Sequence, residues 1–213
     1  MTKALITGTT SGIGKEIKHK FENENIEVIE CNRDMCDLAD VSAIENFIKS
    51  IDVTDIDILV NNAGAAFYGL HENLAPGKIS IMVDVNLKAP MILCNLLLPT
   101  LKKNNGTIIN ICSITADEIN THGAAYGATK AGLKSFTHSL FAEYRKHGVR
   151  CINIQPDMTK TNLYRNANFN VADDQQCYLG PEEVADACVY ALKTKGVNDI
   201  TLRPQKHQIK RIG

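Results

Sequence analysis

Features typical of metal, nucleic-acid and membrane proteins are missing from this 213-residue sequence. Its 23 basic and 24 acidic residues leave a net charge of −1, which gives no electrostatic reason to bind nucleic acid or an anionic membrane. The seven cysteines form no CxxC motif, and neither they nor the six histidines occur at metal-ligand spacings. We therefore expect no metal, and partners that are small molecules or further copies of the chain.

Long hydrophobic runs are also missing. No stretch reaches about 18 uninterrupted apolar residues, and the apolar run in the N-terminal MTKALITG is too short for a signal peptide. No internal repeat or domain linker interrupts the chain, and its length fits one ordinary domain over residues 1–213. The sequence predicts a soluble, cytoplasmic protein with reduced, buried thiols.

A strand, a glycine-rich turn and a helix open the chain. The apolar run KALIT at residues 3–7 leads into GTTSGIG, and Ile13, Ile17 and Phe21 then recur at helical spacing. Such a turn lets the backbone approach a pyrophosphate and aims the helix N-terminus at it. The glycines do not follow the generic GxGxxG spacing, so the alternative interpretation is a simple helix-capping turn.

The connection after the second expected strand, residues 26–31, is unusually short. A parallel crossover needs a dozen or more residues, yet only a few separate Cys31 from the next candidate strand at 35–37. We infer that this crossover helix is missing and that the strand after it is vestigial or absent. A helix at 41–51 and a buried strand at 56–60 follow, and the strand ends in NNAG at 61–64.

The remaining pattern alternates helices and strands. A long helical region at 76–103 contains Pro90 and Pro99, which we expect to kink or divide it. Residues 157–180 lack strong periodicity and are interpreted as a loosely held lid or substrate loop. The other elements are expected at 106–112 (strand), 124–147 (helix), 149–156 (strand), 181–194 (helix) and 198–204 (strand).

Three side chains suggest proton chemistry. Tyr126 and Lys130 stand four apart on the expected helix, so both project from one face. A nearby ammonium group favours the ionised phenol and should lower the pKa of Tyr126, making it a candidate general acid/base. Ser113 follows a strand end that would deliver its hydroxyl to the same cleft. Taken alone, the tyrosine and lysine could also be a surface pair.

Together these motifs resemble the short-chain dehydrogenase/reductase family. TGTTSGIG at 7–14 matches its TGxxxGxG, NNAG matches outright, and Asn86, Ser113 and the YxxxK pair fall at the family's spacing. The resemblance implies an α/β, doubly wound Rossmann-type three-layer fold with a mainly parallel sheet. Its strand order would be near 3-2-1-4-5-6-7, with strand 3 shortened or missing.

The resemblance also implies NAD(P)(H)-dependent carbonyl reduction or alcohol oxidation. Tyr126 would protonate the carbonyl oxygen, Ser113 would orient it, and Lys130 would hold the nicotinamide ribose, while Asn86 would fix a water molecule. The implied cofactor contacts are Gly8, Thr10, Ser11, Gly12, Ile13, Gly14, Asn32, Arg33, Asp37, Leu38, Asn62, Ala63, Gly64, Tyr126, Lys130, Pro156, Thr159 and Thr161. Where the family usually has Pro-Gly, this chain has Pro156-Asp157.

Coenzyme choice depends on the residues just past the second strand. Asn32 stands where NAD-preferring relatives carry aspartate, and the next residue is Arg33, which could pair with a 2′-phosphate. Glu30 should face away by strand alternation, and Asp34 lies beyond the turn. The pattern favours NADP(H) over NAD(H).

Other features remain open at the sequence level. The alternative function is a non-catalytic dinucleotide sensor, which would not need the proton-transfer residues. A lyase or epimerase would need a larger substrate domain.

A homodimer or homotetramer is expected through the helices at 76–103 and 124–147. The basic tail at 203–211 is interpreted as a solvated terminus or subunit contact rather than a phosphate or nucleic-acid patch. Candidate substrate contacts are Phe67, Tyr68, His122, Met158, Leu163 and Tyr164.

Overall fold

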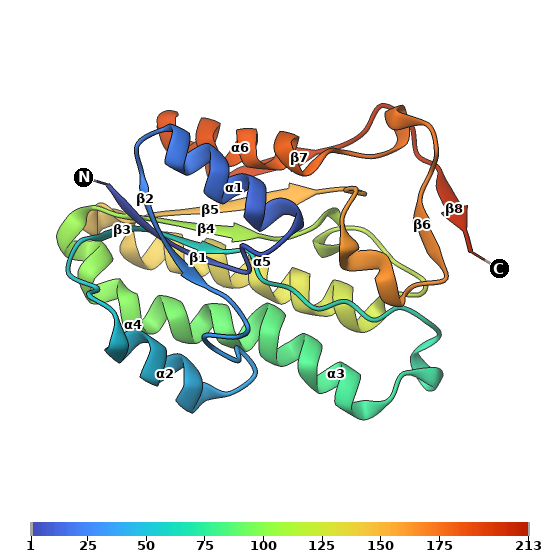
Figure 1. The fold of residues 1–213 in the computed structure, drawn as a ribbon, viewed down its shortest axis with the longest axis horizontal. Helices are drawn as coiled ribbons and strands as arrows, with labels where there is room; N and C mark the ends of the chain where they lie inside the picture. Colours follow the sequence, from blue (N-terminus) through green and yellow to red (C-terminus); the bar gives the residue numbers. More distant parts are fainter. Residues whose placement is uncertain (1, 213) are drawn as a thin grey trace.

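A parallel sheet covered by helices on both faces forms the body of the molecule in the computed structural model, which describes residues 2–212 (Figure 1). The sheet has the order β2-β1-β3-β4-β5-β7, and every neighbouring pair is parallel. Its strands are Lys3–Thr7 (β1), Glu27–Cys31 (β2), Ile56–Asn61 (β3), Thr107–Ile111 (β4), Arg150–Pro156 (β5) and Asp199–Leu202 (β7). The predicted Rossmann-type fold is confirmed, and the order reverses between β1 and β3, where such sheets bind ligands.

No crossover helix forms directly after β2, as the sequence predicts. The backbone carbonyl of Asn32 accepts hydrogen bonds from the amides of Met35 and Cys36, both at 2.9 Å, and so closes a tight turn. Within the described chain no helix or strand forms between Cys31 and Asp37. The next element is helix α2, Val41–Ser50, whose N-cap Asp40 accepts from the Ser42 amide. β2 is therefore the outermost strand of the sheet.

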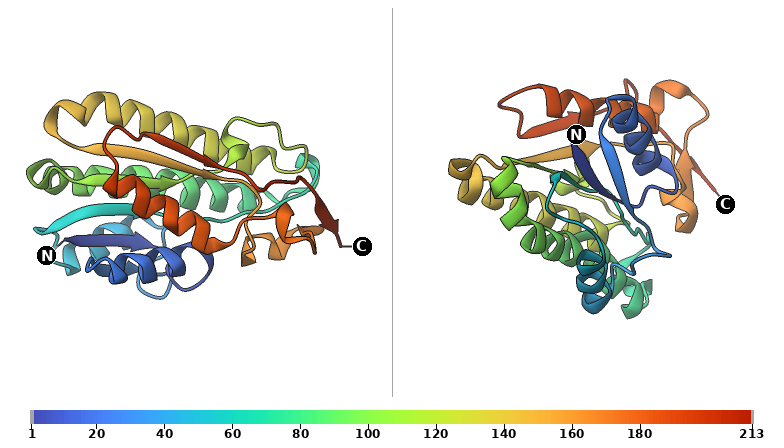
Figure 2. Two further views of the ribbon diagram at one scale, coloured as in Figure 1. Left: turned by 90° about the horizontal axis from the view of Figure 1, so that it is seen from above. Right: turned by 60° about the vertical axis from the view of Figure 1, so that its left-hand side comes forward.

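Helices pack on both sides of the sheet because its central strands are apolar on both faces. All five residues of β4 are buried. One core lies between the sheet and helices α1 (Gly12–Asn23) and α6 (Pro181–Lys193), and the other between the sheet and α2, α4 (Ala89–Asn104) and α5 (Ala124–Tyr144). Figure 2 shows the two helical layers from other directions.

A continuous helical segment, Pro76–Asn104, joins α3 (Pro76–Val83) to α4 through a π-helical turn at Asp84–Lys88. By length and composition alone this segment could cross a membrane, but 44% of its most apolar window is buried in the protein, where Leu93, Leu97 and Leu101 pack into the core. Of the expected effects of the prolines, Pro99 does not divide the helix, because α4 runs through it. The irregular turn lies just before Pro90 instead.

A second, smaller sheet lies beyond the carboxyl ends of the main strands (Figure 1). It consists of β6 (Phe169–Val171) and β8 (Ile209–Arg211), paired antiparallel. We call it the β6–β8 ribbon. The C-terminal tail is mostly exposed, as a solvated terminus would be, and its last strand pairs with the 157–180 segment of the same chain.

Candidate active site

A cleft of about 950 Å³ contains almost every residue that the sequence analysis selected. The glycine loop, the turn after β2, the NNAG turn and the segment after β5 all line it. So do Ser113, Tyr126 and Lys130. Asn86 alone among the selected residues is not on its wall. The cleft therefore brings together residues from segments more than 100 positions apart in the sequence.

The glycine loop, which we call the glycine cradle, has no room for a side chain at Gly8 or Gly14. Gly8 has φ +71°, a left-handed conformation that favours glycine. A Cβ on Gly14 would lie 2.1 Å from the Gly8 carbonyl oxygen and 2.3 Å from Nδ2 of Asn62. Because these two positions lack side chains, the start of α1 packs directly against the end of β1 and the NNAG turn. This shape fits the pyrophosphate of a dinucleotide.

The N-terminus of α1 adds electrostatic attraction for an anion. Helix α1 begins at Gly12, and the side chain of its N-cap residue, Ser11, makes no capping hydrogen bond. First-turn amides of a helix have no partner within the helix, and they carry the positive end of its dipole. Because both Ser11 and Gly12 line the cleft, these amides are available to bind phosphate oxygens.

The NNAG turn is fastened to the glycine loop. Nδ2 of Asn62 donates to the backbone oxygens of Thr7 and Gly8, both at 2.9 Å. Oγ1 of Thr7 in turn accepts from the amides of Asn62 and Ala63 at 3.0 and 2.9 Å. These four hydrogen bonds join the ends of β1 and β3, so the two turns form one rigid wall. The shape of that wall depends on Asn62, for which the resemblance implied only a cofactor contact.

Asn32 and Arg33 line the cleft at the end of β2, but in different ways. Asn32 is 9% exposed, and its Oδ1 accepts from the amide and the hydroxyl of Thr9 at 2.8 and 3.0 Å. Its Nδ2 donates to Glu30 at 3.2 Å. Arg33 is exposed and forms no ion pair within the described chain. Its guanidinium is therefore an unpaired cation at this end of the cleft.

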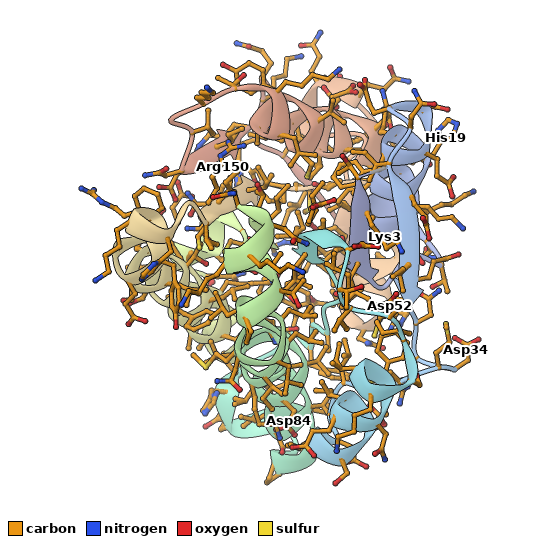
Figure 3. All side chains as sticks on the ribbon, turned by 90° about the vertical axis from the view of Figure 1, so that its left-hand side faces the viewer. Lys3, His19, Asp34, Asp52, Asp84 and Arg150 are labelled. Carbon is orange, nitrogen blue, oxygen red and sulfur yellow. The ribbon has the colours of Figure 1, made fainter. Side chains whose placement is uncertain are left out.

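The two acidic residues near this corner do not oppose Arg33. Glu30 points to α1, where the Lys18 ammonium approaches it at 2.5 Å. Hydrogen bonds from Lys18 and Thr9 lower the pKa of Glu30, which keeps it ionised and paired. Asp34 is exposed and projects outward from the turn (Figure 3). Both placements agree with the expectation that neither carboxylate reaches the coenzyme ribose.

Ser113, Tyr126 and Lys130 meet at the end of β4, and all three are less than a tenth exposed. Oγ of Ser113 accepts hydrogen bonds from the amide and the hydroxyl of Thr115, at 3.2 and 3.0 Å. Both lone pairs of that oxygen are then engaged, so its own hydrogen is free to be donated into the cleft. Thr115 was not selected from the sequence, because nothing in its spacing marks it.

The pKa of Tyr126 differs from the expectation. Burial raises it well above its ordinary value; the neighbouring Tyr164 adds to the increase, and the contact with Ser113 partly opposes it. Nζ of Lys130 lies 5.8 Å from the centre of the Tyr126 ring and donates to the Ile111 carbonyl at 2.7 Å. The prediction that Lys130 lowers the pKa of Tyr126 is thus wrong for the protein without coenzyme. Removal of the phenol from water raises this pKa, and that is its largest influence.

Lys130 is itself affected by burial. Desolvation lowers the pKa of its ammonium group, and the neighbouring Cys112 thiol acts in the opposite direction. An amine with a lowered pKa releases its proton more readily. The Ile111 carbonyl oxygen accepts a hydrogen bond from this amine and holds it at the end of β4, on the cleft wall.

Asn86 supports the site from behind. Its Oδ1 accepts from the Ala65 amide at 2.7 Å, and its Nδ2 donates to the Ala65 carbonyl at 2.8 Å and to Thr129 Oγ1 at 3.1 Å. Only one lone pair of Oδ1 is left for the predicted water molecule. The π-helical turn carries Asn86 into this position between the NNAG segment and α5, consistent with the frequent use of such turns at functional sites.

The segment after β5 continues the cleft wall. Thr159 is 3% exposed, and its hydroxyl donates to the Asp157 carbonyl at 2.9 Å. The side chain of Thr161 accepts from the Leu163 amide and lies against the glycine loop, 3.2 Å from where a Cβ of Gly12 would stand. Thr161 therefore lies beside the glycine loop, on the predicted pyrophosphate side of the cleft. Asp157 in place of glycine is accommodated, because its carboxylate accepts from the next amide, that of Met158, at 2.6 Å.

Aromatic rings form the opposite end of the cleft. The Tyr68 ring lies 5.8 Å from that of Tyr126, 6.2 Å from Tyr164 and 5.0 Å from Phe169, measured between centroids. The other candidate substrate contacts, Phe67, His122, Met158 and Leu163, also line the cleft. Phe169 was missed at the sequence level because it lies in a loop without periodicity. The residues His207, Ile209 and Arg211 of the C-terminal tail were missed for the same reason.

Comparison with known proteins gives a consistent result. A family model described as short chain dehydrogenase matches residues 34–171. An uncharacterized oxidoreductase of Staphylococcus saprophyticus is 32% identical, with 94% of this chain and 96% of the relative aligned. One from Staphylococcus epidermidis is 31% identical over the same shares of both chains.

Solved structures share the fold at lower identity. An alcohol dehydrogenase from the archaeon Thermococcus sibiricus, complexed with 5-hydroxy-NADP, is 22% identical with a TM-score of 0.83 and covers 98% of this chain and 99% of its own. A 3-ketoacyl-(acyl-carrier-protein) reductase from Brucella melitensis, complexed with NADH, is 23% identical with a TM-score of 0.84 and covers 96% and 98%. At these identities the likeness concerns the fold.

Proposed function

The chain belongs to the short-chain dehydrogenase family, and from that premise we propose how its cleft works. It is an oxidoreductase that uses a nicotinamide dinucleotide and acts on the carbonyl or alcohol group of a small molecule. The glycine cradle and the NNAG turn fit the coenzyme, which supplies or accepts the hydride when it is bound. The chain's own side chains handle the proton.

In our proposal Tyr126 is the general acid/base. During reduction its phenol gives a proton to the substrate oxygen, while the free hydrogen of Ser113 hydrogen-bonds to the same oxygen. Two donors aimed at an oxygen that gains negative charge stabilise the transition state. Lys130, buried behind Tyr126, returns a proton to the phenolate after each turnover.

The raised pKa of Tyr126 supports a bias toward reduction. A phenol with a raised pKa stays protonated at neutral pH, and this is the form that donates. Alcohol oxidation requires the phenolate, which is scarce under the same conditions. We therefore propose that carbonyl reduction is the faster direction near neutral pH.

The observation that carries this proposal is the meeting of Ser113, Tyr126 and Lys130, all buried, on the wall of a cleft that also holds the glycine cradle. The test is a screen of carbonyls with either reduced coenzyme, followed by absorbance, and repeated with Tyr126→Phe. We expect that variant to lose about 10²- to 10⁴-fold in kcat while still binding coenzyme. Tyr144→Phe, outside the cleft, is the matched control.

Two outcomes would contradict the proposal. Tyr126→Phe with wild-type turnover of a verified substrate would remove the tyrosine from the mechanism. Coenzyme binding without turnover of any carbonyl or alcohol would favour the alternative, a non-catalytic dinucleotide sensor.

We also propose NADP(H) as the preferred coenzyme. Asn32 offers an uncharged amide where a carboxylate would repel a 2′-phosphate, and the Arg33 guanidinium beside it is free to bind one. Glu30 is paired with Lys18 and does not compete for Arg33. Titration of NADPH and NADH against the wild-type protein measures the preference directly.

Assembly and location also belong to our proposal. Val83 and Met91 on the Pro76–Asn104 helical segment are 37–40% exposed, which supports a homodimer or homotetramer formed through this segment. All seven cysteines are buried and free, which suits the reducing cytoplasm. Light scattering tests the assembly, and a monomeric mass at working concentration would overturn it.

A further inference from the structure

The β6–β8 ribbon brings the C-terminal tail to the substrate end of the cleft. Phe169 stands directly opposite Arg211 in its register, and Val171 opposite Ile209. The two strands are separated by more than 35 residues in the sequence. Two side chains directly opposite each other in an antiparallel pair point to the same face, and successive residues point to opposite faces.

The face that carries Arg211 is turned toward the cleft. The Phe169 ring packs 5.0 Å from the Tyr68 ring and 5.6 Å from the Tyr164 ring, so its face of the ribbon looks inward. Arg211, as its register partner, shares that face. The alternation agrees, because Ile209 and Arg211 both line the cleft, whereas Lys210 between them pairs with Asp173 at 2.9 Å.

Two arginines at this end of the cleft have no carboxylate partner within the described residues, although the carboxylate of Asp157 lines the same cleft. Arg165 and Arg211 both line the cleft, and within residues 2–212 neither forms an ion pair; Arg165 donates only to the Asn162 carbonyl. Glu118 lines the same region but is paired with Arg203. The carboxylate of Asp157 accepts from the adjacent backbone amide. Two guanidinium groups are therefore available for an anion.

An apolar stretch separates these cations from the reacting centre. The Tyr126 ring contacts Tyr68 at 5.8 Å, and Tyr68 contacts Phe169, the register partner of Arg211. A ligand reaching from Tyr126 to Arg211 passes along aromatic side chains. A ligand that is complementary to this path has an apolar middle and a negative charge at the far end.

We propose that Arg211, assisted by Arg165, binds an anionic group of the substrate, so that the enzyme acts on carbonyl compounds whose carboxylate or phosphate lies across an apolar body from the reacting carbon. This inference rests on the proposed function and adds its substrate class. Guanidinium groups bind both anions through paired hydrogen bonds. Arg211 is thus a specificity-determining residue supplied by the end of the chain.

The test compares benzaldehydes that differ only in the para substituent: a carboxylate, a phosphate ester or a neutral carboxamide. We expect the wild-type kcat/KM to be about tenfold higher for an anionic compound than for the carboxamide, the effect of one charged hydrogen-bonded contact. Carboxylate and phosphate are assayed separately, so that the preferred anion is identified. The preference should shrink as salt is added, because the arginines are exposed.

Variants on the two faces of the ribbon locate the effect. Arg211→Gln should bring the ratio of anionic to neutral kcat/KM close to one, and Arg165→Gln should lower it less. Lys210→Gln, on the opposite face of the same strand, is the matched control and should keep the ratio. Circular dichroism checks that all three fold.

Failure of this inference differs from failure of the proposed function. A wild-type ratio near one for both anions, or an unchanged ratio in Arg211→Gln, overturns the anion site. If the carboxamide is then still reduced in a Tyr126-dependent way, the proposed function stands. If no aldehyde in the series, nor any straight-chain ω-oxo carboxylate, is reduced, while another carbonyl or alcohol is turned over in a Tyr126-dependent way, only the anion site is overturned. If no carbonyl or alcohol is turned over at all, the proposed function is overturned as well.

Discussion

The coenzyme half of the cleft is made of backbone and short polar side chains, whereas its substrate half is made of aromatic rings and long cationic side chains. In the first, Asn62 and Thr7 join two turns through four hydrogen bonds. In the second, Tyr68, Tyr164 and Phe169 pack ring against ring. The first half is built at the ends of central strands, and the second on a ribbon of two three-residue strands.

This difference assigns separate tasks to the two halves. Hydrogen-bonded backbone fixes positions within narrow limits, which suits a ligand of constant shape. Packed rings on a short ribbon leave room for substitution without disturbing the sheet. Changes in one half should therefore leave the other working, and each prediction below tests that separation.

The largest effect is expected from Gly14→Ala. The added Cβ would lie 2.1 Å from the Gly8 carbonyl oxygen, so the backbone of the cradle must shift. We expect dinucleotide affinity to fall by about 100-fold and the free energy of unfolding to drop by about 1–3 kcal/mol. Calorimetric titration and thermal unfolding measure the two effects.

Gly77→Ala is the control for this change. Nothing lies within 4 Å of a Cβ at that exposed position in α3, so alanine should be neutral there or stabilise by up to about 1 kcal/mol. Equal losses in both variants would show that the cradle has no special steric requirement.

Next in size is the pH dependence of the two reaction directions. Because burial raises the pKa of Tyr126, the phenolate needed for alcohol oxidation should increase about tenfold per pH unit from neutral pH upward. Reduction, which needs the phenol, should stay flat over the same range. Initial rates in both directions against pH measure this, and an oxidation rate that is flat near neutrality would contradict a raised pKa in the working enzyme.

Arg33→Ala should have a smaller and more selective effect. We expect NADPH to bind about five- to tenfold more weakly, while NADH binding changes little, because only the 2′-phosphate is lost as a partner. Asp34→Ala, the outward-facing neighbour, controls for the turn itself. Unchanged NADPH binding in Arg33→Ala would show that this residue does not read the phosphate.

The smallest effect is expected in the substrate half. Phe169→Leu removes an edge-to-face contact with Tyr68, a type of contact that contributes about 0.5–1.5 kcal/mol. KM for a carbonyl substrate should rise about two- to tenfold, with coenzyme affinity unaltered. A parallel loss of coenzyme binding would mean that the two halves are coupled.

The sequence predicts the coenzyme half well because its determinants are local. The glycine turn, NNAG and the Tyr126–Lys130 pair each lie within a few residues of a strand or helix end, so spacing alone identifies them. The absence of a helix directly after β2 could be predicted too, because only a few residues separate Cys31 from Asp37. Phe169 and Arg211 could not, because their meeting depends on a pairing between distant segments with no periodic pattern.

The pKa of Tyr126 was mispredicted for a related reason. Sequence spacing places Lys130 beside the tyrosine, but it does not reveal how completely both are removed from water. Desolvation depends on everything packed around the pair, including Tyr164 from a remote segment. Likewise, the role of Thr115 in orienting Ser113 depends on the local 3-10 turn rather than on a motif.

The short turn after β2 also has a consequence for solubility. With no further strand beside it, β2 forms the rim of the sheet, and one side of its backbone has no strand partner there. Such a rim can recruit a strand from another molecule and start aggregation. The five residues of β2 read EVIEC, and both glutamates form ion pairs, Glu27 with Lys3 and Glu30 with Lys18. A second identical rim would have to remove these charged groups from water in order to pair, which discourages edge-to-edge stacking of sheets.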